Sequence, residues 1–158
     1  MEYYCLVPSP AGEILLISDG EALTGLYFSD ERGRTGIRHN DELPVFVRTR
    51  DWLRRYFLGE SPPPEEIPIK LIGSPFAQSV WAELRKIPYG KAASYGDIAR
   101  AIGCRSAQAV GGAVGRNPIS IIVPCHRVLG ANGALTGYAG GLRRKIVLLD
   151  TEKIPYKT

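Results

Sequence analysis

Three consecutive prolines, Pro62 to Pro64, stand near the middle of this 158-residue chain within the stretch GESPPPEEIP. Proline has no amide proton and its ring clashes with the preceding helical turn, so this stretch excludes a helix. Its prolines and glutamates are typical of a linker. The sequence before this linker has the pattern of β-strands, and the sequence after it has the pattern of short helices. We therefore predict an N-terminal domain over residues 1–72 and a C-terminal domain over residues 73–158.

The N-terminal part has the pattern of a sheet and one helix. The runs YYCLV, EILLIS and LTGLYFS are rich in β-branched and aromatic residues and are separated by Gly, Pro and Asp, which predicts an antiparallel sheet. From Leu43 to Leu58 apolar side chains recur at helical spacing, and Gly59 ends the pattern. With the helices expected after the linker, the fold class is α+β.

The C-terminal part predicts short helices. The first begins at Ser74-Pro75 and continues to Pro88, and the second begins at Ser94, where a Ser-x-x-Asp pattern resembles a capping box. A third helix opens near Ser106. The last two, joined by a turn with a glycine, have the outline of a helix-turn-helix.

Charge is distributed unequally between the two parts. Residues 1–72 carry a net charge of −4 and residues 73–158 a net charge of +8. A basic half favours a polyanionic partner such as nucleic acid, although a solvated basic surface is the alternative.

Gly111 and Gly112 each cost about 1 kcal/mol in a helix relative to alanine. They indicate a close backbone approach, either to a phosphate backbone or to a neighbouring helix.

Composition argues against several classes of protein. No apolar run approaches the length of a membrane span, and MEYYCLVPSP does not resemble a signal peptide, so the expected location is the cytoplasm. The three cysteines are odd in number and widely spaced, without a Cys-x-x-Cys pair. We therefore expect neither a disulfide framework nor a metal site.

The stretch IIVPCHRVLG carries the strongest chemical signal. Pro124 suits the first position of a helix, which predicts that Cys125 lies at a helix N-terminus, where the dipole lowers the pKa of a thiol. His126 is then a possible base. Asn117, before a proline, indicates a turn. Each of these residues also has an interpretation without function. Cys125 can be read as an inert buried cysteine and Asn117 as a simple turn former, and Glu152, near the C-terminus, as a surface carboxylate.

Several motifs together resemble the O6-alkylguanine-DNA alkyltransferase family. These are PFAQSVW, IPYGKAASYGDIA, VGGAVGRNPISIIV, PCHRV, GYAGG and LLDTE, which cover residues 74–152 almost without gaps. The N-terminal part matches only in outline. The resemblance implies an N-terminal antiparallel sheet with a helix, of ribonuclease H-like type, followed by a helical, winged-helix-like DNA-binding domain.

The resemblance also implies an activity, which is direct DNA repair by a methylated-DNA–protein-cysteine methyltransferase that works once. The alkyl group passes from O6-alkylguanine to Cys125, which His126 bridges through water to Glu152. Asn117 holds the turn and Tyr95 donates toward the guanine. No cofactor is needed. The residues expected to form the base pocket are Val128, Tyr138, Ala139 and Gly140.

The partner implied by the resemblance is double-stranded DNA, which a monomer binds through the minor groove and from which it extrudes the damaged base. One position departs from the family, because Gln108 stands where an arginine usually enters the base stack. The residues expected to contact DNA are Ser94, Tyr95, Arg105, Ser106, Ala107, Gln108, Gly111, Gly112 and Arg116.

Three other functions remain open at this point. A non-enzymatic binder of alkylated DNA resembles the same domain but lacks the cysteine, so Cys125 argues against it. A transcriptional regulator could use the helix-turn-helix alone if Cys125 is unreactive. A Cys-His hydrolase has no evident third member for its triad.

Overall fold

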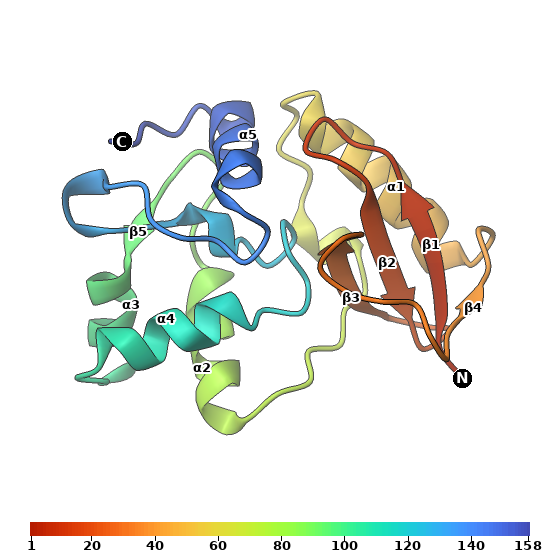
Figure 1. Ribbon diagram of the computed structural model, residues 1–158, viewed down its shortest axis with the longest axis horizontal. Helices are drawn as coiled ribbons and strands as arrows, with labels where there is room; N and C mark the ends of the chain where they lie inside the picture. Colours follow the sequence, from red (N-terminus) through yellow and green to blue (C-terminus); the bar gives the residue numbers. More distant parts are fainter.

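The computed structural model describes the whole chain, residues 1–158, and its N-terminal part is a small sheet covered by a helix (Figure 1). Helix α1 (Pro44–Phe57) packs along one face of the sheet. The order of the strands in the sheet is β3-β2-β1-β4. The strands are β1 (Tyr3–Val7), β2 (Ile14–Ser18), β3 (Leu23–Phe28) and β4 (Arg38–His39).

The three strands that the sequence predicted, β1, β2 and β3, are antiparallel as expected. The sheet has a fourth strand that was not predicted, β4, which pairs with β1 in parallel. Strands joined by a tight hairpin are antiparallel because the hairpin reverses the chain. The segment between β3 and β4 is longer and crosses to the far edge of the sheet, so β4 can pair with β1 in parallel. The sheet is therefore mixed.

The linker covers the free edge of β3. The backbone N–H of Leu23 donates to Pro68 O at 2.8 Å, and the N–H of Lys70 donates back to Leu23 O at 2.9 Å. Within the linker, residues Pro64–Glu66 form one 3-10 turn, η1. The prediction that this stretch excludes a helix is therefore right for an α-helix and wrong for this single turn, where proline occupies the first position and needs no hydrogen bond.

The C-terminal part contains four helices and a two-stranded parallel ribbon of β5 and β6 (Figure 1). Helix α2 ends at Leu84, before the predicted boundary at Pro88. None of the helices in the structure is long and apolar enough to cross a membrane. The elements are α2 (Pro75–Leu84), β5 (Ala93–Ser94), α3 (Tyr95–Ile102), α4 (Ala107–Gly115), β6 (Val128–Leu129), the 3-10 turn η3 (Ala131–Gly133) and α5 (Leu142–Glu152).

Local signals explain where these helices begin. The Ser74 hydroxyl accepts a hydrogen bond from Ala77 N, and Ser106 caps α4 in the same way. Ser94 and Asp97 form both bonds of a capping box at the start of α3. Such caps satisfy amide groups that have no partner within the helix, so the starts of α2, α3 and α4 are encoded locally, whereas α5 has no side-chain cap.

One cluster of 31 buried side chains draws from both parts of the chain. The outer edge of β3 also pairs with a loop of the C-terminal part, because Leu26 N donates to Pro118 O and Ser120 N donates to Leu26 O. The sheet is thus joined by backbone hydrogen bonds to the loop that leads to Cys125.

Candidate active site

The loop from Asn117 to Cys125 is buried, and the side chain of Asn117 holds it closed. Its Nδ2 donates to Val123 O at 2.8 Å, and its Oδ1 accepts from Ile119 N at 3.0 Å. Ile121 takes a left-handed conformation, with φ of 71°. The loop therefore reverses sharply and brings Cys125 back beside the end of α4.

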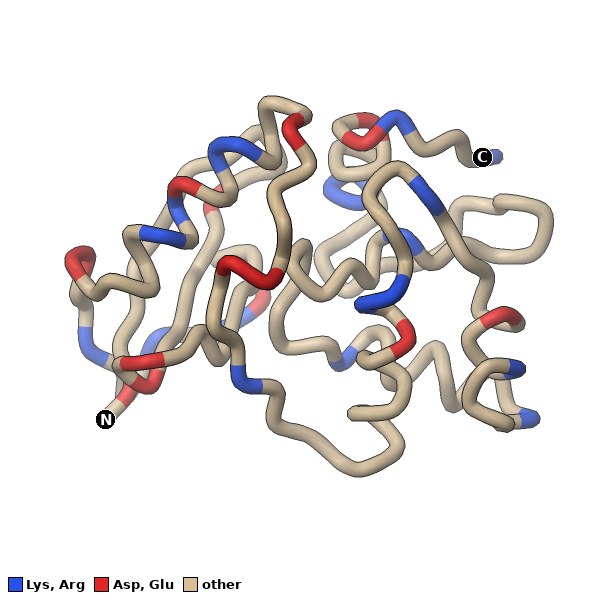
Figure 2. The backbone as a smooth tube through the Cα atoms, turned by 180° about the vertical axis from the view of Figure 1, so that it is seen from behind, with Lys and Arg blue, Asp and Glu red and all other residues tan.

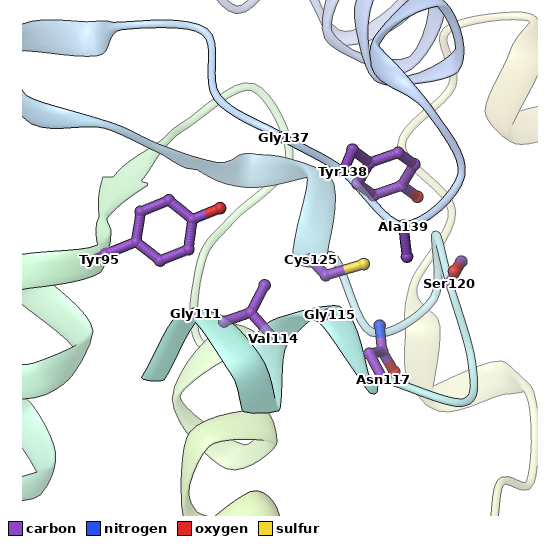
Figure 3. A pocket seen from close by; sticks show the side chains of 10 residues that line it. All are labelled: Tyr95, Gly111, Val114, Gly115, Asn117, Ser120, Cys125, Gly137, Tyr138 and Ala139. Carbon is purple, nitrogen blue, oxygen red and sulfur yellow. The ribbon is translucent and has the colours of Figure 1, made fainter. Parts of the chain in front are cut away.

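Cys125 faces a pocket of about 170 Å³ (Figure 3). Six of the residues predicted for the site line it, and four others, Val114, Gly115, Ser120 and Gly137, were not predicted. Val114 and Gly115 belong to α4, and Ser120 to the loop before the cysteine. The predicted residues that line the pocket are Tyr95, Gly111, Asn117, Cys125, Tyr138 and Ala139.

Two residues predicted for the base pocket lie just outside its lining. The carbonyl of Val128 accepts a hydrogen bond from the Nζ of Lys145 at 2.7 Å. Gly140 lies against β3, and a Cβ at this position would be 2.9 Å from the rings of Phe28 and Tyr138. Glycine is needed here because the loop that carries Tyr138 packs directly on the N-terminal sheet.

The environment of Cys125 differs from the prediction. Pro124 precedes a three-residue 3-10 turn, η2 (Cys125–Arg127), and not the first turn of an α-helix. One isolated turn does not supply a helix dipole. Burial raises the pKa of the Cys125 thiol, and the nearby polar side chains of Asn117, Tyr138 and Ser120 oppose this shift. The sulfur is therefore a neutral thiol that needs a base.

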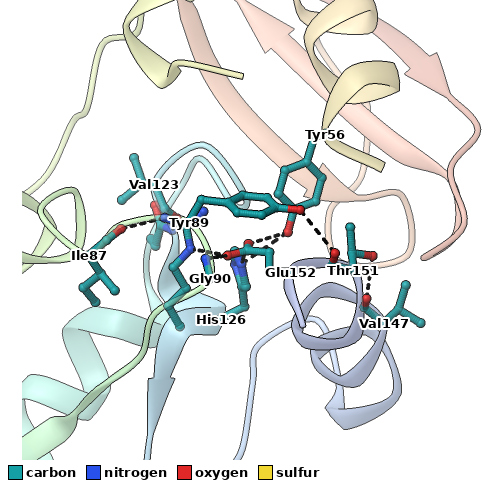
Figure 4. A network of polar contacts seen from close by, with 11 residues as sticks. Tyr56, Ile87, Tyr89, Gly90, Val123, His126, Val147, Thr151 and Glu152 are labelled. Atoms are coloured by element: carbon teal, nitrogen blue, oxygen red, sulfur yellow. Dashed lines mark hydrogen bonds and ion pairs between the residues drawn. The ribbon is translucent and has the colours of Figure 1, made fainter. Parts of the chain in front are cut away.

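A buried polar network lies next to the cysteine (Figure 4). The Nε2 of His126 lies 2.5 Å from Oε2 of Glu152, and both side chains have no exposed surface. The other oxygen, Oε1, accepts from Arg127 Nε at 2.7 Å and from Gly90 N at 3.0 Å. The hydroxyl of Tyr56 donates to Oε2 at 2.6 Å. The interpretation of Glu152 as a surface carboxylate is therefore wrong.

The network sets the protonation of His126. Burial lowers the pKa of this imidazole, so the ring is neutral. Burial alone would raise the pKa of Glu152, but the hydrogen bonds from His126 and Arg127 outweigh it, together with the charge of Arg127 and that of His126 once it is protonated in acid, and lower the pKa to about 2. Because an ionised carboxylate can only accept, the proton of the neutral ring lies on Nε2. Nδ1 is buried and has no hydrogen-bond partner, so it is free to accept a proton.

Sequence reasoning missed three residues of this region. Arg127 stands in the PCHRV motif and donates to both Glu152 and Ile87 O. Lys145 is fully buried, and burial lowers its pKa to about 8. Tyr56 matched the apolar pattern of α1, which gave no hint of its hydroxyl contact. Of these three residues, only Arg127 could have been found from the sequence, because it stands in the PCHRV motif.

Most of the residues predicted to contact DNA come from the start of α3, the turn before α4, and α4 itself, and most of them are exposed. Arg116 lies apart from the others, just after the last residue of α4. Acidic residues gather on the N-terminal part and few are found on the C-terminal part (Figure 2). The helix-turn-helix therefore lies in a half of the molecule that carries excess positive charge.

The two helical glycines are not explained by packing within the protein. A Cβ on Gly111 would lie 3.8 Å from the Tyr95 ring, an ordinary contact, and a Cβ on Gly112 would meet only the flexible end of Arg116 at 3.1 Å. The interpretation that a neighbouring helix requires glycine here is therefore not supported.

No three His, Cys, Asp or Glu side chains come together that could hold a metal ion.

The fold and the site define a class of protein in which a small sheet domain with one helix is joined to a helical domain that carries a buried cysteine. Two family models match the chain, the ribonuclease-like domain of 6-O-methylguanine DNA methyltransferase over residues 2–71 and its DNA binding domain over residues 75–154. The chain belongs to the 6-O-methylguanine DNA methyltransferase family.

Individual relatives match over nearly their whole length. The methylated-DNA–protein-cysteine methyltransferase of Haemophilus influenzae is 48% identical over 98% of this chain and 88% of its own. The constitutive enzyme of that name from Bacillus subtilis is 40% identical over 99% of both chains. The crystal structure of Mycobacterium tuberculosis OGT in complex with DNA is 45% identical, with a TM-score of 0.87 over 96% of this chain and 92% of that one.

Proposed function

We infer that this protein repairs DNA by transferring the methyl group of O6-methylguanine to one of its own cysteines. Its membership of the family and its near full-length match to such methyltransferases support this activity. We assign Cys125 as the acceptor, and one observation carries the assignment. Cys125 faces the pocket beside a neutral imidazole whose Nδ1 is free.

The transfer is an in-line displacement at the alkyl carbon. His126 takes the thiol proton on Nδ1 through a water molecule, and Glu152 stabilises the imidazolium that forms. The sulfur then bonds to the alkyl carbon while the bond from that carbon to O6 breaks. The electron pair of that bond leaves with guanine, toward which the hydroxyl of Tyr95 donates a hydrogen bond. The proton that His126 took from the thiol returns through water and neutralises the base. Asn117 keeps the loop closed so that the sulfur faces the pocket.

The product explains why the protein acts once. The thioether on Cys125 has no adjacent nucleophile that could release the alkyl group, and the chemistry requires no cofactor. The expected contacts to the extruded base are the ring of Tyr138 and the backbone of Val128, Ala139 and Gly140. Lys145 supports this arrangement, because its Nζ donates to the carbonyls of both Val128 and Thr136.

The DNA partner is a duplex bound by a monomer through the minor groove. A relative has been crystallised with DNA. Gly111 and Gly112 leave α4 without side chains at these two positions, so a sugar-phosphate backbone can approach the helix closely there. Because the substrate is DNA, we place the protein in the cytoplasm.

The decisive experiment measures intact protein mass after incubation with a duplex that contains O6-methylguanine. The expected result is the gain of one methyl group, located on Cys125 by peptide mapping, with activity that stops at about one turnover. Cys125→Ser is expected to bind the duplex without gaining mass, because phosphate contacts come from the basic half. Continued turnover, or alkylation of Cys5 or Cys104, contradicts the proposal. Binding without any transfer indicates the non-enzymatic alternative.

A further inference from the structure

We propose that Tyr56, a residue of the N-terminal domain, is a positioning residue for alkyl transfer that acts on His126 through Glu152. The inference rests on the proposed function, since it concerns the same reaction. Tyr56 stands 96 positions before Glu152 in the chain, in helix α1, and does not line the pocket that Cys125 faces. Its contribution is to hold the carboxylate that orients the histidine.

The geometry places the Tyr56 hydroxyl at the junction of the pair (Figure 4). Its oxygen lies 2.6 Å from Oε2 of Glu152 and 3.4 Å from Nε2 of His126. Burial raises the pKa of the phenol well above its usual value, and the charge of Glu152 adds to this shift. The phenol is therefore neutral and donates its proton to the carboxylate.

Tyr56 is held rigidly, so its hydroxyl is fixed in place. The side chain has no exposed surface. Its ring stacks on Trp52 with the centroids 5.6 Å apart and meets the edges of Phe57 and Tyr89 at 5.0 and 6.0 Å. Trp52 in turn donates from Nε1 to Pro63 O in the linker at 2.8 Å. The N-terminal domain therefore presents the hydroxyl from a packed aromatic cluster.

The four donors around Glu152 are divided evenly between its oxygens. Oε1 accepts from Arg127 and Gly90, whereas Oε2 accepts from His126 and Tyr56. Without the phenol, His126 is the only donor to Oε2. The carboxylate then attracts the proton of the imidazole more strongly and favours its charged form.

This change has a definite effect on the pH dependence of transfer. Only neutral His126 can accept the thiol proton, so stabilising the imidazolium raises the pH at which the rate falls off on the acid side. The other charged or titratable groups that face the pair are Arg127 from η2, Lys145 from α5 and Tyr89 from the segment before β5. Arg127 and Lys145 oppose protonation of His126, and the substitution of Tyr56 leaves them in place.

The test compares Tyr56→Phe with a matched control, Tyr89→Phe. Both changes remove one phenol hydroxyl from the same aromatic cluster. The hydroxyl of Tyr89 donates to Thr151 O at 3.2 Å and does not touch the carboxylate. The measurements are the single-turnover rate of methyl transfer from an alkylated duplex between about pH 5 and pH 9, the affinity for the duplex, and the urea midpoint.

We expect Tyr56→Phe to slow transfer about ten-fold near neutral pH, as for the loss of one hydrogen bond to a charged group. Its acid limb is expected to move to higher pH by about one unit. DNA affinity stays within about two-fold of the parent, because binding depends on phosphate contacts far from this network. Tyr89→Phe is expected to keep the profile of the parent.

A second comparison guards against a general effect on folding. If Tyr56 acts through Glu152, then Tyr56→Phe slows transfer in the parent but adds little in a Glu152→Gln background. An unchanged acid limb, a uniform loss of rate matched by a lower urea midpoint, or equal effects in both backgrounds overturns the inference. If the parent itself gains no mass, the proposed function fails instead, so the two failures are distinguishable.

Discussion

Asn117 and Val123 are joined by a hydrogen bond of 2.8 Å from the side-chain amide to the backbone carbonyl, which closes the loop before Cys125. The same side chain accepts from Ile119 N. One buried amide therefore contacts the backbone at two points of the loop, and it is the acceptor for the N–H of Ile119. The position of the cysteine depends on this loop.

We predict that Asn117→Ala destabilises the protein by about 1–3 kcal/mol and lowers the rate of transfer by a larger factor than stability alone explains. The change leaves the buried N–H of Ile119 without a partner and removes one of the two donors to Val123 O, which still accepts from Cys125 N. Urea unfolding and single-turnover rates check this. Asn40→Ala is the control, because it removes a side-chain acceptor for Glu42 N in an exposed loop. Equal effects of the two substitutions would refute the role of Asn117.

Glu152→Gln is expected to slow transfer by roughly ten- to a hundred-fold, as for loss of a partner that orients a functional histidine. Its effect on DNA affinity is expected to be small, since removal of a negative charge does not weaken attraction to a polyanion. Rate and affinity are measured on the same alkylated duplex. Equal rates for variant and parent at several pH values would show that Glu152 has no part in the reaction.

Stability is predicted to fall in acid. The pKa of Glu152 in the folded protein is lowered to about 2 from a usual 4.5, so its contribution is complete above the usual value and is lost as pH falls toward about 2. The shift corresponds to about 3 kcal/mol. Protonation of His126, whose pKa is lowered by burial, adds to the loss below about pH 6.5. Urea midpoints near pH 7, pH 5 and pH 3 measure the change in stability. In Glu152→Gln, the fall in the urea midpoint between pH 5 and pH 3 is expected to be smaller than in the parent.

Gly111→Ala separates DNA contact from protein packing. The structure has room for the added methyl group, and alanine favours a helix over glycine, so we expect the variant to be as stable as the parent or more stable by up to about 1 kcal/mol. We expect it to bind duplex DNA more weakly, because the methyl group projects toward the backbone of the DNA. A thermal melt and a binding titration at fixed salt measure the two effects. Loss of stability would instead assign the glycine to packing.

Gln108→Arg addresses the departure from the family. Extruding a base costs a few kcal/mol, and a guanidinium can stack in the vacated space where glutamine cannot. We expect the variant to bind alkylated duplex more tightly and react faster, with little change toward free O6-benzylguanine, which needs no extrusion. Gln108→Lys, tested at the same salt concentration, separates charge from stacking.

Arg105 offers an alternative to Gln108. It lies about one turn earlier, just before the cap of α4, and both side chains are exposed. If Gln108→Arg leaves duplex kinetics unchanged while Arg105→Ala slows them, Arg105 is the residue that enters the stack. If neither substitution changes the duplex kinetics, neither residue enters the base stack in place of the extruded base.

The sequence alone determined the features that depend on neighbouring residues. The caps at Ser74, Ser94 and Ser106, the turn at Asn117 and the proline-rich linker each act within a few positions, so their effect can be read locally. The motif around Cys125 identified the family for the same reason. Its residues lie in one short stretch.

Tertiary structure decided the rest. The direction of β4 follows from how the chain crosses the sheet, and the raised pKa of Cys125 follows from burial that no local pattern records. The contact between Tyr56 and Glu152 joins residues far apart in the chain, and in the sequence Tyr56 is indistinguishable from an ordinary core position of α1. Burial and long-range hydrogen bonds are properties of the closed fold, and they set the protonation of the residues beside the cysteine.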